Sequence, residues 1–309
     1  MKNKVLVTGC TGLVGHGICL SLLSKGYQVW GTSRNKIESN HPSFYPVVLD
    51  LEKESSLSEL TKILDKVDIL IHNAALLPGN NKYSFDKYLK INFNATTELI
   101  KKSIETGIKQ IIYISGSPLS FQKEINNFIT EESPYLPKND YVTSKALSEF
   151  ICLQYINKNE IPLSVFRFTA PYGYINKSKS VFSTFINSAK RGNPITLWGK
   201  GGREQTFTFV EDIGEACSLA INKKSSGIFT ITGPEKISMK NLAEKVLQAF
   251  PKSDSKIIFQ NKIDPQEGFS VSISTKRAQK ELGFVAKNYL SHSIRKIVNS
   301  DDSIYFFKY

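Results

Sequence analysis

The chain has 309 residues, of which 40% are hydrophobic and 22% charged, proportions that are ordinary for a globular enzyme. Its formal net charge of +12 raises the question of nucleic-acid binding. The basic residues are mostly lysines scattered singly or in pairs, whereas a nucleic-acid surface concentrates its cations on one face or arm. We therefore expect no nucleic-acid partner, and the charge suits an anionic small-molecule substrate instead.

The cysteines and the hydropathy exclude several other classes of protein. The four cysteines are Cys10, Cys19, Cys152 and Cys217, and their spacing indicates neither a metal site nor a disulfide framework. The first apolar run is too short for a signal peptide. No segment approaches the roughly 20 apolar residues that span a bilayer. We expect a cytoplasmic protein without a metal or a membrane contact.

Short β-branched runs alternate with segments of helical spacing through the first half of the chain. The predicted strands are Lys4–Thr8, Gln28–Thr32, Tyr45–Leu49, Asp68–His72, Gln110–Ser115 and Leu163–Phe168. The predicted helices are Gly12–Lys25, Leu57–Leu64, Phe85–Thr106 and Val142–Asn157. Continuous apolar strands joined by crossover helices are typical of a parallel sheet buried on both faces. The sequence thus predicts an α/β fold with a Rossmann-type, doubly wound parallel sheet.

The pattern loosens after about Pro171 and predicts a smaller C-terminal α+β lobe. Its expected helices are Val181–Lys190, Val210–Asn222, Met239–Phe250 and Thr275–Leu282, and its expected strands are Gln205–Phe209 and Gly227–Thr232. We expect a dinucleotide-binding domain over residues 1–170 and a substrate-binding lobe over 171–309, partly interleaved with it. The aromatic tail, Ser303–Tyr309, is expected to dock on the domain or on a partner subunit.

Three glycines follow the first predicted strand with a spacing of two residues. Gly9 allows a sharp strand-to-helix turn, Gly12 lets the backbone approach a pyrophosphate, and Gly15 lets the helix pack closely on the strand. The helix N-terminus then offers free N–H groups to the phosphates. Because the triplet lies at the first strand–helix junction of a βαβ pattern, it indicates a bound dinucleotide.

The end of the second strand distinguishes NAD from NADP. A carboxylate there would bind the adenosine ribose hydroxyls and favour NAD, but the chain has Ser33-Arg34 and no acidic residue. Ser33 could donate to a 2′-phosphate, and Arg34 could pair with it through two hydrogen bonds. The sequence therefore favours NADP(H), with NAD(H) possible if Arg34 only stacks on adenine or lies in solvent.

A tyrosine and a lysine four residues apart open a predicted helix. Tyr141 and Lys145 lie on one helix face. A nearby ammonium, together with a cationic nicotinamide ring, lowers the pKa of a phenol from its usual ~10 and makes it an acid–base catalyst. Ser117, on the loop after the fifth strand, can hydrogen-bond the reacting oxygen. Ser117, Tyr141 and Lys145 are the expected catalytic residues.

These motifs in this order resemble the extended branch of the short-chain dehydrogenase/reductase superfamily, which includes sugar-nucleotide epimerases, dehydratases and reductases. The resemblance is carried by TGCTGLVG (Thr8–Gly15), Asp50-Leu51, HNAA (His72–Ala75), INFNATTEL (Ile91–Leu99), YISGS (Tyr113–Ser117), YVTSK (Tyr141–Lys145), RFTAPYG (Arg167–Gly173), GKGGREQTFTFVEDIGEA (Gly199–Ala216), ITGPEKISMKNLAEKV (Ile231–Val246) and STKRAQKELGF (Ser274–Phe284). It covers nearly the whole chain.

The resemblance implies a set of cofactor contacts. Asp50 and Leu51 would contact the adenine, Ala74 would line the cofactor cleft, and Lys145 would also bind the nicotinamide ribose. With these, the expected cofactor-binding residues are Gly9, Thr11, Gly12, Leu13, Val14, Ser33, Arg34, Asn73, Ala75, Asn92, Ser115, Tyr141, Ala170 and Pro171. The resemblance also implies a homodimer formed through the helices Phe85–Thr106 and Val142–Asn157.

Departures from the family pattern narrow the choice of reaction. The family's dehydratases follow the catalytic Ser/Thr with an Asp-Glu pair, but here Pro118-Leu119 follows Ser117, which argues against dehydration. Its 4-epimerases usually hold NAD and carry the acidic residue after the second strand, which this chain lacks. We therefore rank an NADPH-dependent reductase of a 4-keto sugar nucleotide first. A sugar-nucleotide 4-epimerase is the alternative, and a non-catalytic dinucleotide sensor is a further one.

The substrate contacts are less typical of the family. Many members place arginines that grip the substrate pyrophosphate at the positions of Gln205 and Gln266, and an Asn at that of Ala170. Arg203 could substitute for the missing arginine, or it could only support the loop. The expected substrate-binding residues are Ser117, Tyr141, Arg203 and Gln205.

Overall fold

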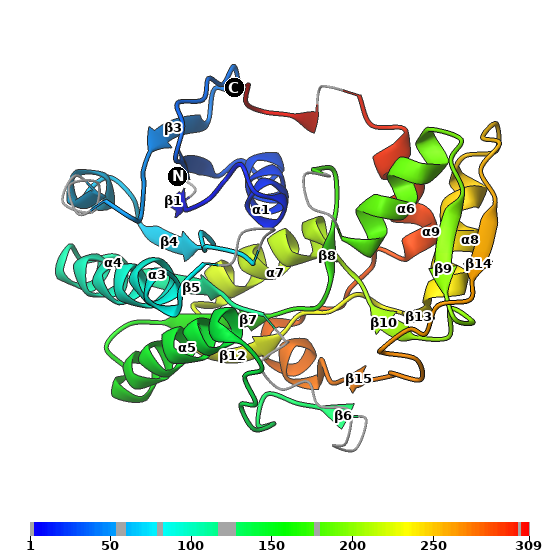
Figure 1. The fold of residues 1–309 in the computed structure, drawn as a ribbon. Helices are drawn as coiled ribbons and strands as arrows, with labels where there is room; N and C mark the ends of the chain where they lie inside the picture. The colour runs from blue at the N-terminus through cyan, green and yellow to red at the C-terminus, as the bar shows by residue number, and fades with distance from the viewer. Residues whose placement is uncertain are drawn as a thin grey trace.

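A seven-stranded parallel sheet forms the centre of the molecule (Figure 1). The computed structural model describes residues 3–53, 60–78, 83–116, 128–175, 180–301 and 304–308. The strands follow the order β12-β7-β5-β4-β1-β2-β3. They are β1 (Lys4–Val7), β2 (Gln28–Ser33), β3 (Phe44–Val48), β4 (Ile69–His72), β5 (Gln110–Ile114), β7 (Leu163–Arg167) and β12 (Gly227–Thr230). The predicted α/β fold with a Rossmann-type sheet is confirmed.

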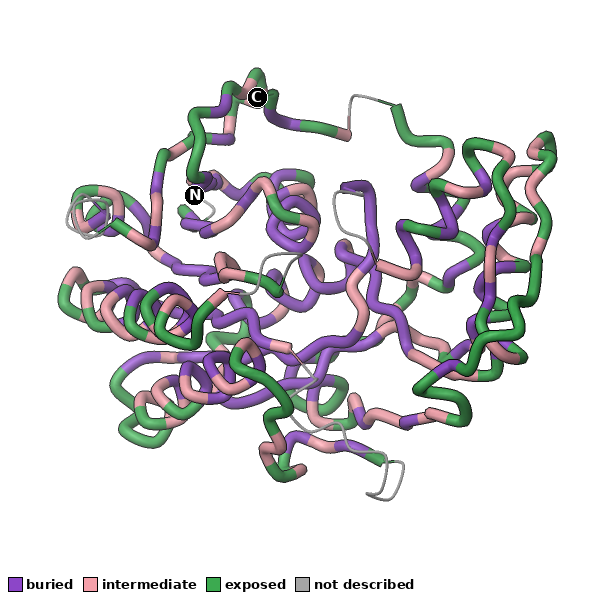
Figure 2. The backbone as a smooth tube through the Cα atoms, viewed as in Figure 1, coloured by how far each residue is buried: buried purple, intermediate pink, exposed green. Residues whose placement is uncertain are grey.

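Helices cover both faces of this sheet. In Figure 1, α1 (Leu13–Ser24) and α7 (Val210–Lys223) lie on one face, and α4 (Ala95–Glu105) and α5 (Asp140–Lys158) lie on the other. β4, β5 and β7 are buried along their whole length (Figure 2). Successive side chains of each strand enter two different hydrophobic cores, one on each face, because side chains alternate along a strand. The continuous apolar runs of the sequence follow from this double burial.

The strand order reverses beside β1. The chain builds β1, β2 and β3 outward in one direction, then returns to place β4 on the other side of β1 and continues outward through β5, β7 and β12. Neighbouring crossovers therefore diverge at the carboxyl ends of β1 and β4. In open α/β sheets, ligands bind at this switch point.

The helix expected over residues 85–106 consists of three pieces. It comprises α3 (Phe85–Tyr88), the π-helical segment η1 (Leu89–Asn94) and α4. π-Helical turns widen a helix locally and occur frequently at functional sites. The widened turn here contains the buried Asn92, one of the expected cofactor-binding residues.

The second lobe is built from short elements of the C-terminal half. They are α6 (Val181–Lys190), α8 (Met239–Ala249), α9 (Leu290–Val298), η3 (Ala278–Leu282) and paired strands that include β9 (Ile195–Trp198) with β14 (Ile257–Gln260) and β10 (Glu204–Thr206) with β13 (Lys236–Ser238). Two further pairs lie outside the central sheet: β8 (Pro171–Tyr172) with β11 (Thr208–Phe209), and β6 (Phe128–Ile129) with β15 (Ser272–Ile273). α7 and β12, which follow residue 171, lie on the central sheet instead. A division at residues 170/171 stays a prediction.

The C-terminal tail docks on the sheet domain, beside α1 and β3 (Figure 1). Phe306 is buried and stacks on the ring of His16, with 5.0 Å between the ring centroids. Its carbonyl oxygen accepts a hydrogen bond from the hydroxyl of Ser39. Lys308 pairs with Glu38 through two backbone hydrogen bonds of 2.8 and 2.9 Å. The aromatic residues of the tail thus complete the core above α1.

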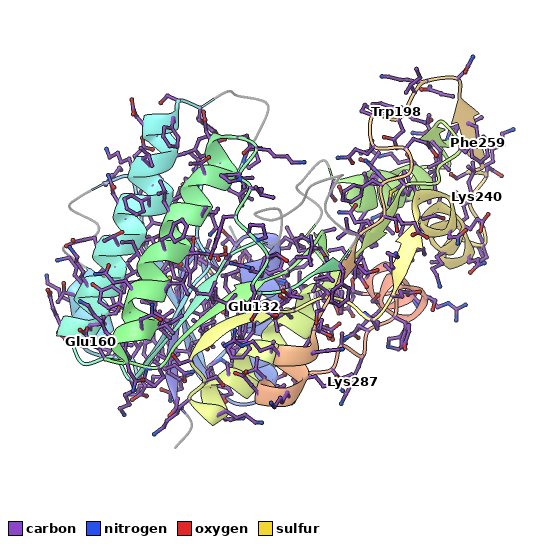
Figure 3. The ribbon with its side chains drawn as sticks, turned by 90° about the horizontal axis from the view of Figure 1, so that it is seen from below. Glu132, Glu160, Trp198, Lys240, Phe259 and Lys287 are labelled. Atoms are coloured by element: carbon purple, nitrogen blue, oxygen red, sulfur yellow. The ribbon has the colours of Figure 1, made fainter. Side chains whose placement is uncertain are left out.

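We predict that Phe306→Ala lowers the free energy of unfolding by about 3 kcal/mol, the usual cost of truncating a buried phenylalanine. The control is Phe259→Ala, because Phe259 is 52% exposed at the outer end of the second lobe (Figure 3), and its change should stay within about 0.5 kcal/mol. Urea unfolding of both variants measures the difference. Equal effects would show that the tail contributes no core packing.

Candidate active site

The loops after β1 and β4 are tied together at the switch point of the sheet. The hydroxyl oxygen of Thr8 accepts hydrogen bonds from the backbone N–H groups of Asn73 (3.0 Å) and Ala74 (2.9 Å). The side-chain amide of Asn73 donates to the carbonyl oxygens of Thr8 and Gly9, each at 3.3 Å. These bonds hold both loops in one fixed surface at the carboxyl edge of the sheet.

The glycine loop needs glycine at two of its three positions for steric reasons. Gly9 has a φ of +71°, which L-residues rarely adopt. A Cβ on Gly15 would lie 2.2 Å from the carbonyl oxygen of Gly9, so the helix could not pack so closely. α1 begins at Leu13 after Gly12, which has no side chain to cap the free N–H groups of the first turn. Such a helix N-terminus binds phosphate groups.

The two residues expected to bind a 2′-phosphate, Ser33 and Arg34, lie at the end of β2. Ser33 is buried, and its hydroxyl donates to the carbonyl oxygen of Asn35 at 2.5 Å. Its single donor is therefore already used. Arg34 is exposed. Beyond β3, Leu51 is buried, and a carboxylate oxygen of Asp50 accepts from the backbone N–H of Glu52.

Asn92 connects three of the segments that surround the site. Its side-chain oxygen accepts from the N–H of Leu76 at 2.7 Å, and its amide donates to the carbonyl of Leu76 and to the hydroxyl of Ser144. The loop after β4, which includes Ala75, is thereby attached to η1 and α5. Asn92 thus holds this loop in place, a role that its position in the INFNATTEL motif did not by itself indicate.

The structure places Tyr141 and Lys145 in the first two turns of α5, at the carboxyl edge of the sheet. The side chain of Asn139 caps this helix by accepting from the N–H of Val142. Lys145 is buried, its ammonium donates to the carbonyl oxygen of Ile114 at the end of β5 (2.9 Å), and it lies 4.2 Å from the ring centroid of Tyr113. Burial lowers the pKa of Lys145 to about 8.

Tyr141 is half-buried and meets the ring of Tyr88 edge-on, with 6.1 Å between the ring centroids. Burial, and to a smaller extent Tyr88, raises the pKa of Tyr141 to about 12. The phenol is therefore protonated at neutral pH. A cation bound nearby would be needed to favour the phenolate.

Four more of the residues expected in the site follow β5 and β7 in the sequence. Ser117 lies outside the described residues. Ser115 is buried at the end of β5 and donates its hydroxyl to Glu149. Ala170 has a φ of +36° directly before β8, a conformation that is strained for a residue with a side chain. Pro171, which follows it, pairs with β11.

Arg203 and Gln205 belong to the second lobe. Arg203 donates to the side-chain oxygen of Gln266 at 2.6 Å, and its guanidinium lies 3.8 Å from a carboxylate oxygen of Asp264. Gln205 pairs with Ile237 between β10 and β13. The structure thus brings Arg203, an expected substrate-binding residue, into contact with Gln266, a position where many family members carry an arginine.

Two buried side chains near Lys145, His72 and Glu149, were not predicted from the sequence as parts of the site. His72 bridges the hydroxyls of Thr8 and Thr96, at 2.8 Å on each side. Burial and the charge of Lys145 lower its pKa to about 3. Glu149 carries a fully buried carboxylate one helical turn beyond Lys145. His72 lies within the HNAA motif, but nothing in that motif indicated its partners Thr8 and Thr96.

No group of three or more metal-ligating side chains occurs among the described residues. In the same part of the chain, no helix is both long and apolar enough to cross a bilayer.

A family model described as "NAD dependent epimerase/dehydratase family" matches residues 5–232. The chain belongs to this family. It is therefore an enzyme, and the family resemblance seen in its motifs is confirmed. The uncharacterized protein y4nG of Sinorhizobium fredii is 27% identical over 80% of this chain, which spans only 60% of that relative. A UDP-N-acetyl-alpha-D-glucosaminuronate decarboxylase of Bacillus cytotoxicus is 25% identical, over 84% of this chain and 83% of the relative.

The fold is shared with a UDP-glucuronic acid 4-epimerase from Bacillus cereus, solved in complex with UDP-glucuronic acid and NAD. The TM-score is 0.81 at 22% identity, over 96% of this chain and 98% of the other. The comparisons give no support to NADP or to a reductase, which the sequence favoured.

Proposed function

We propose that the chain is an NAD-dependent 4-epimerase of a nucleotide-activated sugar. The observation that carries the proposal is that Tyr141 and the buried ammonium of Lys145 lie at the carboxyl edge of the same parallel sheet whose first strand leads into the glycine loop. Family membership and the 4-epimerase with the same fold support it.

The residues at the switch point fit a dinucleotide. The uncapped first turn of α1 would hold the pyrophosphate, Leu51 and Asp50 would border the adenine, and Lys145 would bind the nicotinamide ribose. Bound there, NAD would supply hydride transfer from carbon 4 of the sugar and back to the opposite face of the same carbon, without net consumption of cofactor.

Tyr141 would move the proton in both halves of this reaction. Its phenolate accepts the proton of the 4-hydroxyl as the hydride leaves, and the phenol returns it when the hydride comes back. Lys145 would stabilise that phenolate by its charge. Ser117 would orient the reacting oxygen. For the diphosphate of the substrate, Arg203 is the candidate contact, held in place by Gln266 and Asp264.

The reductase and dehydratase alternatives are less well supported. A reductase needs fresh reduced cofactor in each turnover, and the hydroxyl of Ser33 is already bonded to Asn35 instead of being free for the 2′-phosphate of NADPH. Dehydration needs an acid–base pair after the catalytic serine, where the chain has Pro118-Leu119. An inactive sensor is disfavoured by the intact Tyr141–Lys145 pair. The helices α4 and α5, side by side in Figure 3, remain our proposed homodimer surface.

We predict that the purified enzyme interconverts C4 epimers of UDP-hexoses or UDP-hexuronic acids without net consumption of cofactor. Tyr141→Phe should lower kcat by a factor of about 10² to 10⁴, the usual contribution of a positioned acid–base group, while NAD affinity changes little. Chromatographic separation of the sugar nucleotides measures the rate.

The matched control is Tyr155→Phe, the same substitution on α5 about four turns further on, which should retain full activity. Carbon dioxide release from a UDP-hexuronic acid, or stoichiometric oxidation of NADPH by a 4-keto sugar, would contradict the proposal in favour of a decarboxylase or a reductase. Tight cofactor binding without any turnover would instead indicate a sensor.

We further predict that the enzyme binds NADH at least as tightly as NADPH, because Ser33 has no free donor. Arg34→Ala should leave NADH affinity within about twofold and weaken NADPH binding about tenfold, as expected from the loss of one charge-assisted pair. Fluorescence titration with both cofactors tests this. A more than tenfold preference of the wild type for NADPH would overturn the NAD assignment.

A further inference from the structure

Glu149 is a fully buried carboxylate to which the proposed chemistry gives no role. It lies on α5 four residues beyond Lys145, so the two side chains are neighbours on one helix face. A charge removed from water is retained only when it is paired and hydrogen-bonded. Its partners therefore indicate what it does.

Three side chains converge on this carboxylate. Arg167, the last residue of β7, donates to Oε2 from Nη2 at 2.7 Å and from Nε at 3.0 Å. The hydroxyl of Tyr135 also donates to Oε2, at 2.9 Å. Ser115, at the end of β5, donates to Oε1. The side chain of Arg167 is only 4% exposed and that of Glu149 is not exposed at all, so both charges are desolvated together.

The network extends from this pair to the edge of the sheet. Arg167 also donates to the carbonyl oxygen of Glu131 at 3.1 Å, and the carboxylate of Glu131 accepts from the N–H of Thr230 in β12 at 2.8 Å. Ser115 and Glu131 stand in the sequence on either side of Ser117. The Glu149–Arg167 pair thus fixes the ends of β5, β7 and β12 next to the site.

The charge of Glu149 acts on Lys145. The groups around that ammonium are the carbonyl of Ile114, the ring of Tyr113, the imidazole of His72, the thiol of Cys152 and the carboxylate of Glu149. His72 is neutral at neutral pH, because burial lowers its pKa to about 3. Burial raises the pKa of Cys152 far above neutrality, so the thiol is uncharged as well. Among the described residues, Glu149 is the anion that opposes the desolvation of Lys145.

We propose that Glu149 is a positioning residue whose buried charge, held by Arg167 and Tyr135, keeps the Lys145 ammonium protonated and whose second oxygen fixes Ser115 at the end of β5. The inference rests on the proposed function, because protonated Lys145 is needed to stabilise the Tyr141 phenolate. Glu149 itself is fully buried among its partners, so it would act through Lys145 and Ser115.

The test is the pH titration of Lys145 in wild type and in Glu149→Gln, followed by NMR of enzyme labelled at the lysine ε-carbons and assigned with Lys145→Met. In the wild type the signal should titrate near pH 8. The neutral amide removes the anion and leaves Arg167 unbalanced, so the midpoint should fall by at least one pH unit. The alkaline limb of the pH profile of kcat/KM should move down by the same amount, a tenfold effect on the ionisation constant.

Two further variants keep the test decisive. Tyr135→Phe removes one hydrogen bond but no charge, and its Lys145 midpoint should stay at the wild-type value. Glu149→Gln with Arg167→Met removes both charges of the pair, so it provides a folded protein if the single variant is unstable, and its midpoint should also fall. An unchanged midpoint in the variants lacking Glu149 would overturn the inference and leave the pair a purely structural role. A shifted midpoint in an enzyme that epimerises no sugar would support the inference while refuting the proposed function.

Discussion

A charged amine buried at the carboxyl edge of a parallel sheet is the constraint on which the rest of the site depends. Lys145 donates to the last carbonyl of β5 and lies over the ring of Tyr113. An ammonium in such surroundings loses its hydration, so it stays charged at neutral pH only with nearby compensation. The sheet supplies a carbonyl dipole and α5 supplies the carboxylate of Glu149. That carboxylate in turn requires the guanidinium of Arg167 from β7. The order of the strands therefore determines which charges surround Lys145.

The elements of the central sheet domain were predictable because apolar runs alternate there regularly with segments of helical spacing. The strands of the central sheet and the helices α1 and α5 lie within one or two residues of the ranges expected from that pattern. Strands of the second lobe such as β9 and β14 were missed because they lie outside this regular alternation. The expected strand over 205–209 divides into β10 and β11, which pair with different partners. Such pairing is set by tertiary contacts.

The residue types of the site could be recognised in the sequence. The hydrogen-bond partners that occupy some of these residues in the folded chain could not. Tyr141 and Lys145 follow from helical spacing alone. Nothing local, however, indicated that Ser33 donates to Asn35 or that Arg203 meets Gln266. The first of these bonds removes a donor on which the NADP hypothesis depended. The pairing of Glu149 with Arg167 likewise joins two elements whose contact only the folded sheet establishes.

In the proposed epimerisation, the hydride that leaves carbon 4 of the sugar nucleotide returns to the same carbon. The most direct test is the fate of deuterium placed at carbon 4 of a UDP-hexose incubated with the enzyme in ordinary water. The inverted sugar should retain the deuterium at carbon 4, and no free reduced cofactor should accumulate. Loss of the label to water, or its release on free NADH or NADPH, would contradict the proposed reaction.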